Sequence, residues 1–483
     1  MQFFANFYSS KKGSVFFMKR RTLRDELKVP LKSFEAFIEV AVLSLLYYFV
    51  WRNTYDVGIF PYYHYNGKYV LIGVYALITI ILFDNLDCFK FGELKFLDVG
   101  LGQLVGLLGT NIITYFQLCL IANRMVTPLP IIMLFALQLI VAAILLKLYQ
   151  IIYYKLYAPR NMILVYGNSN AVELKIKMDS RPEKYNVSKL ISTDAGFDKI
   201  TEEILKYDAV ILNDIPAQLR NDILKFCFKR DIRIYVVPKI SDLLLRGGKT
   251  VSSFDTPLIY VKQQGISFSQ RIIKRAMDLF LSVIALIIAS PIMLGVAIAI
   301  KIEDGGPTFY KQERLTINQK KFYILKFRSM VQNAEALTGA VLASEDDPRI
   351  TKVGKFIRAT RLDELPQLIN IFKGDMSFVG PRPEREKFVD EFSKDMPEFI
   401  FRTKVKGGLT GFAQIYGKYN TSSYDKLRLD LMYIENYSLL LDIKLLLLTI
   451  KIIFSKDSTE GIDVAEQNKK LAQELIENQN SED

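Results

Sequence analysis

The stretch Leu279-Phe-Leu-Ser-Val-Ile-Ala-Leu-Ile-Ile-Ala-Ser290-Pro291-Ile-Met-Leu-Gly-Val-Ala-Ile-Ala-Ile300 is apolar throughout and long enough to span a bilayer. Ser290 and Pro291 stand near its middle, where proline breaks a helix and frees backbone groups that need partners; the Ser290 hydroxyl is one candidate. Both flanks are basic: Lys274 and Arg275 before, and Lys301, Lys311, Arg314, Lys320 and Lys321 after. Because basic flanks stay in the cytoplasm, we expect a re-entrant helix over residues 270–301 that kinks and returns. An ordinary fifth transmembrane helix is the alternative.

Upstream of this stretch, four apolar segments each approach the roughly 20 residues that span a bilayer. They cover residues 34–52, 69–84, 98–121 and 128–152. The loop near 53–68 is poor in Lys and Arg, whereas the loop near 85–97 and the chain after the fourth segment are basic. The positive-inside rule therefore predicts a four-helix transmembrane bundle over residues 34–155 with both ends in the cytoplasm.

The amino-terminal residues 1–33 are rich in Lys and Arg and show no small-residue cleavage site after a short apolar core. They are predicted to be a cytoplasmic basic arm rather than a signal peptide. Inside the spans, Gln103, Asn111 and Gln117 are predicted to make helix-packing contacts.

The composition agrees with an integral membrane protein of at least two domains: 483 residues, half of them hydrophobic, with a net charge of +12. The charge suits anionic lipid and phosphorylated substrates, and no motif indicates nucleic acid. The three cysteines form no zinc or disulfide pattern. Since the single histidine, His64, falls in a predicted outer loop, carboxylates must carry any acid–base chemistry.

Residues 160–250 are predicted to form a small Rossmann-like α/β domain, with strands at 162–166, 208–212 and 232–237. The turn over residues 167–171 lacks the G-x-G-x-x-G pattern, so a structural role, or a dimerising one that makes a homodimer, is favoured over dinucleotide binding. Tyr185 and Lys189 match the Tyr-x-x-x-Lys pair of nucleotide-sugar epimerases, but they come too soon after the first turn and are interpreted as chance. Residues 246–270 read as a linker with one edge strand.

The remainder, residues 302–463, is predicted to be a mainly α catalytic domain held at the membrane by the re-entrant helix. Its apolar stretch 427–454 carries Asp430, Asp442 and Lys451, which favours amphipathic helices lying in the interface over another span. Residues 464–483 are a polar tail.

Two adjacent carboxylates mark the centre of this domain. They lie in Arg358-Ala-Thr-Arg361-Leu-Asp363-Glu364-Leu-Pro-Gln, and the basic turn Pro381-Arg382-Pro383 follows. Adjacent carboxylates suit divalent-cation and phosphate chemistry, and arginines are bidentate phosphate donors. The plain alternative is a solvated, ion-paired helix face.

The surrounding motifs resemble the bacterial sugar transferases, the monotopic polyprenyl-phosphate phosphoglycosyltransferases, in their long form. The matching runs are Lys274-Arg-Ala-Met-Asp278, Ser290-Pro291, Gly306-Pro307, Gln312-Glu-Arg314, Lys326-Phe-Arg-Ser-Met330, Asp347-Pro-Arg349, Leu362-Asp-Glu-Leu-Pro-Gln367, Gly374-Asp-Met-Ser-Phe-Val-Gly-Pro-Arg-Pro383 and Gly408-Leu-Thr-Gly411.

The resemblance implies transfer of a sugar-1-phosphate from a UDP-sugar to undecaprenyl phosphate, with release of UMP, as the first membrane step of exopolysaccharide, capsule or O-antigen synthesis. It implies that Asp363 is the nucleophile of a covalent phosphosugar intermediate, that Mg²⁺ is bound at Asp363 and Glu364, and that the catalytic domain lies on the cytoplasmic face of the inner membrane. Glu364 either holds the metal or accepts a proton.

Cations must offset the repulsion between a carboxylate nucleophile and a diphosphate. The predicted phosphate-binding residues are Lys326, Arg328, Arg358, Arg361, Arg382 and Lys418. Lys418 stands where many relatives carry arginine, so it keeps the charge and loses the bidentate fork.

Two other functions compete with this one. A membrane-bound nucleotide-sugar epimerase or dehydratase also pairs membrane helices with an α/β domain, but the missing glycine pattern argues against it. A scaffold or regulator of capsule assembly needs no intact Asp363-Glu364 pair.

Overall fold

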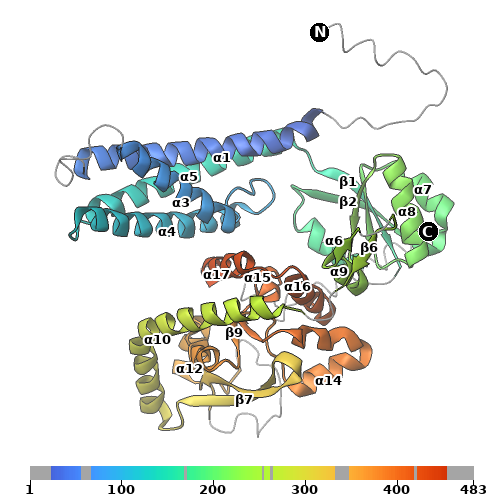
Figure 1. Cartoon of the computed structure of the whole chain (residues 1–483). Helices are drawn as coiled ribbons and strands as arrows, with labels where there is room; N and C mark the ends of the chain where they lie inside the picture. The colour runs from blue at the N-terminus through green and yellow to red at the C-terminus, as the bar shows by residue number, and fades with distance from the viewer. Residues whose placement is uncertain are drawn as a thin grey trace.

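The computed structural model describes residues 23–55, 67–167, 171–252, 255–261, 265–331, 347–417 and 421–453. The chain is mostly helical there, and five helices are long and apolar enough to cross a membrane. Four of them lie side by side (Figure 1): α1 (Leu23–Val50, continued by the π-helical turn Trp51–Tyr55), α3 (Gly67–Asn85), α4 (Phe96–Ala122) and α5 (Leu129–Leu156). The predicted apolar segments therefore coincide with helices.

Helix α1 begins at Leu23 and runs through Pro30, so it starts within the predicted basic arm. The helix extends past the apolar segment since its lysines find partners on the neighbouring elements. Lys32 forms an ion pair with Glu93, and the Lys28 ammonium lies 5.3 Å from the centre of the Tyr153 ring. Residues 1–22 lie outside the described residues.

Polar side chains join the four helices internally. The Asn111 amide donates to Gln138 Oε1 (2.9 Å), and Gln138 Nε2 donates to the Tyr75 hydroxyl (2.7 Å). Gln103 Nε2 donates to Glu39 Oε1 (2.5 Å). These bonds confirm the helix-packing role predicted for Gln103 and Asn111. Gln117 is only partly buried.

The α/β segment forms a four-stranded parallel sheet in the order β2-β1-β3-β4. The elements are β1 (Arg160–Tyr166), α6 (Ala171–Asp179), β2 (Tyr185–Ser192), α7 (Phe197–Ile204), β3 (Ala209–Asn213), α8 (Ala217–Lys229), β4 (Arg233–Val236) and α9 (Ile240–Arg246). The three predicted strands are present, and β2 was not predicted. Polar residues interrupt the apolar ones along β2, so it lacks the apolar run that revealed the other three strands. Tyr185 and Lys189 lie on it, and Lys189 pairs with Glu203 (3.1 Å).

The predicted linker contains two strands rather than one. β5 (Lys249–Val251) and β6 (Leu258–Tyr260) form an antiparallel pair. The sequence predicted only one, because each strand is three residues long and leaves a weak pattern.

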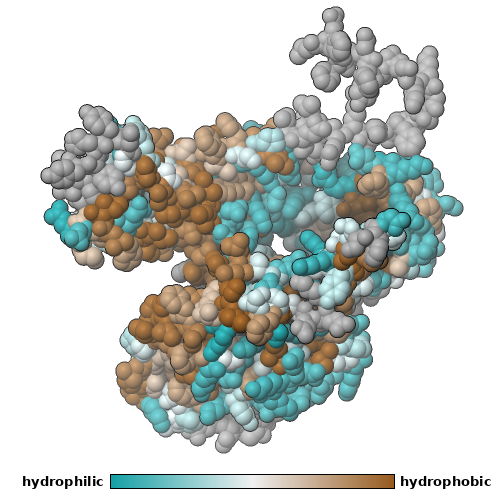
Figure 2. Space-filling model, in the orientation of Figure 1, coloured by the Kyte–Doolittle hydropathy of each residue, from teal (hydrophilic) through white to brown (hydrophobic). Residues whose placement is uncertain are grey.

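Helix α10 (Phe268–Asp304) is the fifth apolar helix and holds Pro291 in its interior. Figure 1 shows it as two arms that meet at a sharp bend. The Ser290 hydroxyl donates to the Ile287 carbonyl (2.8 Å), a short-range partner within the helix. Figure 2 shows hydrophobic side chains over α10 and over the four amino-terminal helices, whereas most of the remaining surface is hydrophilic.

The first arm of α10 is tied to the rest of the carboxy-terminal domain by three polar residues. Lys274 pairs with buried Asp442 (2.6 Å), Arg275 donates to the carbonyls of Ile371 and Phe372, and Asp278 accepts from Ser377 and the Phe378 amide. The domain continues with the hairpin β7 (Phe309–Leu315) and β8 (Lys321–Phe327), α12 (Lys352–Ala359), α13 (Gln367–Lys373), β9 (Ser377–Val379), α14 (Glu386–Asp395), β10 (Gly408–Thr410), α15 (Phe412–Tyr416), α16 (Ser423–Glu435) and α17 (Leu439–Ile453).

The charged residues of α16 and α17 differ from the expected interfacial pattern. Asp430 and Asp442 are buried and pair with Arg402 and Lys274, while Lys444 bridges to Asp87 between α3 and α4 (2.7 Å). These charged residues interrupt the apolar sequence of α16 and α17, and their ion pairs join the two helices to neighbouring parts of the fold. Neither helix is among the five candidate spans found in the described residues.

Candidate active site

The two carboxylates stand on a short 3₁₀ turn, Leu362–Glu364, that follows α12. Arg361 enters this turn in the left-handed region (φ 57°), which reverses the chain after the helix. Leu362 and Leu365, three positions apart, pack against the apolar cluster of Phe327 and Ile357. The leucines fix one side of the turn in the domain and leave Asp363 and Glu364 on the other.

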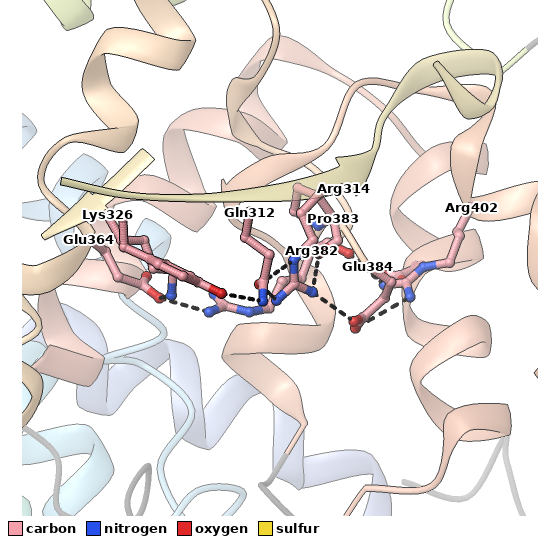
Figure 3. Close-up of polar contacts among 10 residues, drawn as sticks. Gln312, Arg314, Lys326, Glu364, Arg382, Pro383, Glu384 and Arg402 are labelled. Atoms are coloured by element: carbon pink, nitrogen blue, oxygen red, sulfur yellow. Dashed lines mark hydrogen bonds and ion pairs between the residues drawn. The ribbon is translucent and has the colours of Figure 1, made fainter. Parts of the chain in front are cut away.

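Glu364 is held by two cations from different elements. Its Oε1 lies 2.8 Å from Lys326 Nζ on β8 and 2.7 Å from Arg382 Nη2 in the Pro-Arg-Pro turn (Figure 3). Burial opposes ionisation of Glu364, but the charges of Arg382 and Lys326 outweigh it and hold its pKa far below its usual range. The same ion pair raises the pKa of Arg382. Glu364 is therefore a fixed carboxylate at neutral pH.

Asp363 is in a different environment from its neighbour. Within the part of the chain that the structure describes, its carboxylate has no hydrogen bond or ion pair, although the charges of Lys326, Arg358 and Arg382 act on it from nearby. Burial raises its pKa; among the charges, that of Lys326 lowers the pKa and that of Glu364 raises it. Among the described residues, Asp363 thus has a carboxylate without a hydrogen bond or ion pair, beside the carboxylate of Glu364, which two cations hold in place. A carboxylate nucleophile needs such freedom to approach its substrate.

The other predicted phosphate-binding residues divide into two groups. Arg358, in the last turn of α12, is half-buried and acts electrostatically on Asp363, and Arg361 is exposed next to it. Arg328 is only 8% exposed and forms an ion pair with Asp304 at the end of α10. Within the described part of the chain, no contact joins Arg328 to Asp363 or Glu364, and its phosphate-binding role stays a prediction. Lys418 lies outside the described residues.

The sequence interpretation missed a set of residues behind Arg382. Gln312 and Arg314 on β7, together with Glu384 and Arg402, form a polar network around the Pro381-Arg382-Pro383 turn (Figure 3). The run Gln312-Glu-Arg314 was a recognisable motif, but its role depends on β7 lying against this turn. Gly408 shows how tightly the turn packs, since a Cβ there would lie 2.1 Å from the Gly380 nitrogen.

No group of three or more His, Cys, Asp or Glu side chains is arranged to hold a metal ion in the described residues. Magnesium, however, is commonly held by one or two carboxylates together with substrate phosphates and water. Both contacts to Glu364 fall on Oε1, and the Asp363 carboxylate is adjacent. The donor set therefore fits a Mg²⁺ ion that is completed by a bound diphosphate.

This domain is similar in sequence to known proteins. Residues 269–456 match the family described as "Bacterial sugar transferase". The chain is 38% identical over 262 residues to a UDP-N-acetylgalactosamine-undecaprenyl-phosphate N-acetylgalactosaminephosphotransferase of Aeromonas hydrophila (52% of this chain, 60% of the relative).

Two further relatives carry related names. The chain is 38% identical over 213 residues to a UDP-glucose:undecaprenyl-phosphate glucose-1-phosphate transferase of Escherichia coli (43% and 44%). It is 35% identical over 287 residues to the galactosyl transferase CpsE of Streptococcus agalactiae (56% and 62%). The chain thus spans roughly half of the length of these relatives. Residues 269–456 of this protein are thus similar to the bacterial sugar transferase family.

Proposed function

We propose that this protein transfers a sugar-1-phosphate from a UDP-sugar to undecaprenyl phosphate and releases UMP, as the first membrane step of a surface polysaccharide. The names of the Aeromonas hydrophila and Escherichia coli relatives support the two substrates. The observation that carries the proposal is the difference between the two carboxylates, since Asp363 is unattached and Glu364 is held by Lys326 and Arg382.

In the proposed first step, an Asp363 Oδ attacks the β-phosphorus of the UDP-sugar. A bond from this oxygen to the β-phosphorus forms, the phosphoanhydride bond breaks, and UMP leaves with the electron pair. In the second step an oxygen of undecaprenyl phosphate attacks the same phosphorus and displaces the Asp363 carboxylate. The products are undecaprenyl diphosphate-sugar and the regenerated enzyme.

The chain's cations have a defined part in these steps. Lys326 and Arg382 are fixed on Glu364 and so present positive charge beside Asp363, while Arg358 adds charge from α12. Such prearranged charge stabilises the phosphoryl group as negative charge moves to the leaving oxygen. Mg²⁺, held by Glu364 and Asp363 with the diphosphate, would neutralise phosphate charge when bound.

The membrane arrangement is part of the proposal. The four amino-terminal helices form a transmembrane bundle, the parallel sheet is a Rossmann-like domain, and α10 enters and leaves the membrane on the same side. Basic flanks and the bend at the proline-containing middle of α10 support the re-entrant reading, which places the catalytic domain on the cytoplasmic face of the inner membrane.

The test is UMP release by the purified protein in detergent, with undecaprenyl phosphate and a panel of UDP-glucose, UDP-galactose, UDP-N-acetylglucosamine and UDP-N-acetylgalactosamine. We expect UMP and labelled lipid from at least one donor, and neither from Asp363→Asn. Equal UMP release by Asp363→Asn contradicts the assigned nucleophile. A wild-type protein that is inactive with every donor supports a scaffold instead.

A further inference from the structure

The Pro381-Arg382-Pro383 turn is held through its carbonyls. Its two prolines have no N–H to donate. Four consecutive carbonyls each accept one hydrogen bond: that of Pro381 from the Gly408 amide (2.9 Å), that of Arg382 from Arg402 Nη2 (3.1 Å), that of Pro383 from Arg314 Nη1 (3.2 Å) and that of Glu384 from the Leu315 amide (2.9 Å). Two of these donors are arginine side chains, so the position of the turn depends on how those side chains are themselves fixed.

Arg402 is the more buried of these two arginines. It is 5% exposed, lies on the 3₁₀ segment Pro397–Lys404, and stacks 4.8 Å from the centre of the Phe399 ring. Its Nη2 lies 2.8 Å from Oδ2 of Asp430 on α16, and its Nη1 lies 3.7 Å from Glu384. The contact with Asp430 lacks the alignment of a hydrogen bond and is an ion pair. Three elements therefore fix this guanidinium.

The Arg382 side chain points the other way, to Glu364. Its Nη2 contacts Glu364 at 2.7 Å, while its own carbonyl is held by Arg402 (Figure 3). A continuous line of contacts thus runs from Asp430 through Arg402 and Arg382 to the carboxylate beside the nucleophile. Arg402 is too buried to touch a substrate that Arg382, with a side chain 43% exposed, can reach.

We infer that Arg402, fixed by Asp430 and Glu384, is a positioning residue that acts through Arg382: it holds the Pro-Arg-Pro turn so that the Arg382 guanidinium lies on Glu364 and beside the transferred phosphate. This inference rests on the proposed function. If Arg402 had a purely structural role, its removal would lower activity whether or not Arg382 is present. If Arg402 acts through Arg382, its removal lowers activity only while Arg382 is present.

Removing Arg402 alone would leave Asp430 as an unpaired buried charge, which destabilises a fold severely. The informative variant is therefore Arg402→Met with Asp430→Leu, because it removes both buried charges and keeps similar side-chain volume. Arg220→Met with Asp242→Leu, whose side chains are 17% and 27% exposed, is the control. It removes another short arginine–aspartate pair (2.6 Å) in the α/β domain.

The kinetic test is a double-mutant cycle on UMP release. In the wild-type background, R402M/D430L should lower kcat about tenfold through misplacement of the phosphate donor, with KM for the UDP-sugar little changed. In an Arg382→Met background, which itself should lose roughly 10²-fold, the same pair should cause no further loss. The Arg220/Asp242 control should leave kcat unchanged. An equal loss in both backgrounds, or an effect on KM alone, overturns the inference.

A second measurement does not need turnover. Hydrogen exchange at the Leu315 and Gly408 amides, which donate to this turn, should quicken in R402M/D430L and stay unchanged in Arg382→Met. Unchanged exchange in R402M/D430L overturns the inference even if catalysis is impaired. Absence of UMP release by the wild-type protein instead overturns the proposed function and leaves the exchange result standing.

Discussion

Arg382 Nη2 lies 2.7 Å from Glu364 Oε1, so one ion pair joins the Pro-Arg-Pro turn to the turn that carries Asp363. Lys326 reaches the same oxygen from β8. Three segments that are separated in the sequence therefore meet at one carboxylate oxygen, and Asp363, the proposed nucleophile, stands next to this junction.

Glu364→Gln should lower kcat for UMP release roughly 10²-fold, because a neutral amide cannot fix two cations beside the phosphate. Initial rates at saturating UDP-sugar measure this effect. Glu386→Gln, which removes a surface partner of Lys321, is the control and should keep wild-type activity. A Glu364→Gln enzyme within twofold of wild type would show that the junction has no catalytic role.

The pH dependence should report Asp363, which must be ionised to attack. Burial and the charge of Glu364 raise its pKa, so kcat/KM should be present above that raised pKa and lost as pH falls through it. The acid limb should lie above the ordinary aspartate value of 3.8. Glu364→Gln removes one raising charge and should move the limb to lower pH. A limb that moves upward in this variant would contradict the assignment.

The ion pair of Lys274 with Asp442 should matter for stability because both side chains are buried (7% and 0% exposed). Lys274→Met leaves Asp442 unpaired and should cost about 3–5 kcal/mol, whereas Lys274→Met with Asp442→Leu should cost much less. Thermal unfolding in detergent measures both. Lys177→Met removes an exposed partner of Asp425 and should cost at most about 1 kcal/mol. Equal costs for the single and double Lys274 variants would mean that the buried charge is not the cause.

The topology of α10 is tested by cysteines placed on either side of its apolar stretch, in a protein without Cys88, Cys119 and Cys227. Ser269 is the second residue of the helix, and exposed Lys320 follows β7. Neither Ser269→Cys nor Lys320→Cys should react with an impermeant thiol reagent on whole cells. Labelling of Lys320→Cys alone would show that α10 crosses the membrane.

The elements of the fold and the site residues that could be predicted are those that leave a local pattern in the sequence. Long apolar runs gave all five candidate spanning helices, and the apolar strands β1, β3 and β4 were visible for the same reason. β2 was missed because polar residues interrupt the apolar ones along Tyr185–Ser192, so its sequence has no apolar run. The sequence motifs identified Asp363, Glu364, Lys326 and Arg382 as candidate site residues. No local pattern indicates that Lys326 and Arg382 both form ion pairs with Glu364.

The remaining differences depend on tertiary packing. Arg328 stands two positions from Lys326 in the same motif, and alternation along a strand would put both on one face, but β8 ends at Phe327 and Arg328 pairs with Asp304. Arg402 was not singled out in the sequence, and Asp430 was interpreted as a charge of an interfacial helix. Their burial and their contact with the Pro-Arg-Pro turn depend on tertiary packing between the 3₁₀ segment and α16.

The most direct test of the central claim is to find the covalent intermediate on Asp363. The protein is mixed with the UDP-sugar that it uses, without undecaprenyl phosphate, and UMP and the mass of the Asp363 peptide are measured. The account predicts a burst of UMP of at most one equivalent and a phosphosugar on Asp363 that undecaprenyl phosphate then removes. UMP formation that requires undecaprenyl phosphate, with an unmodified Asp363 peptide, would contradict it.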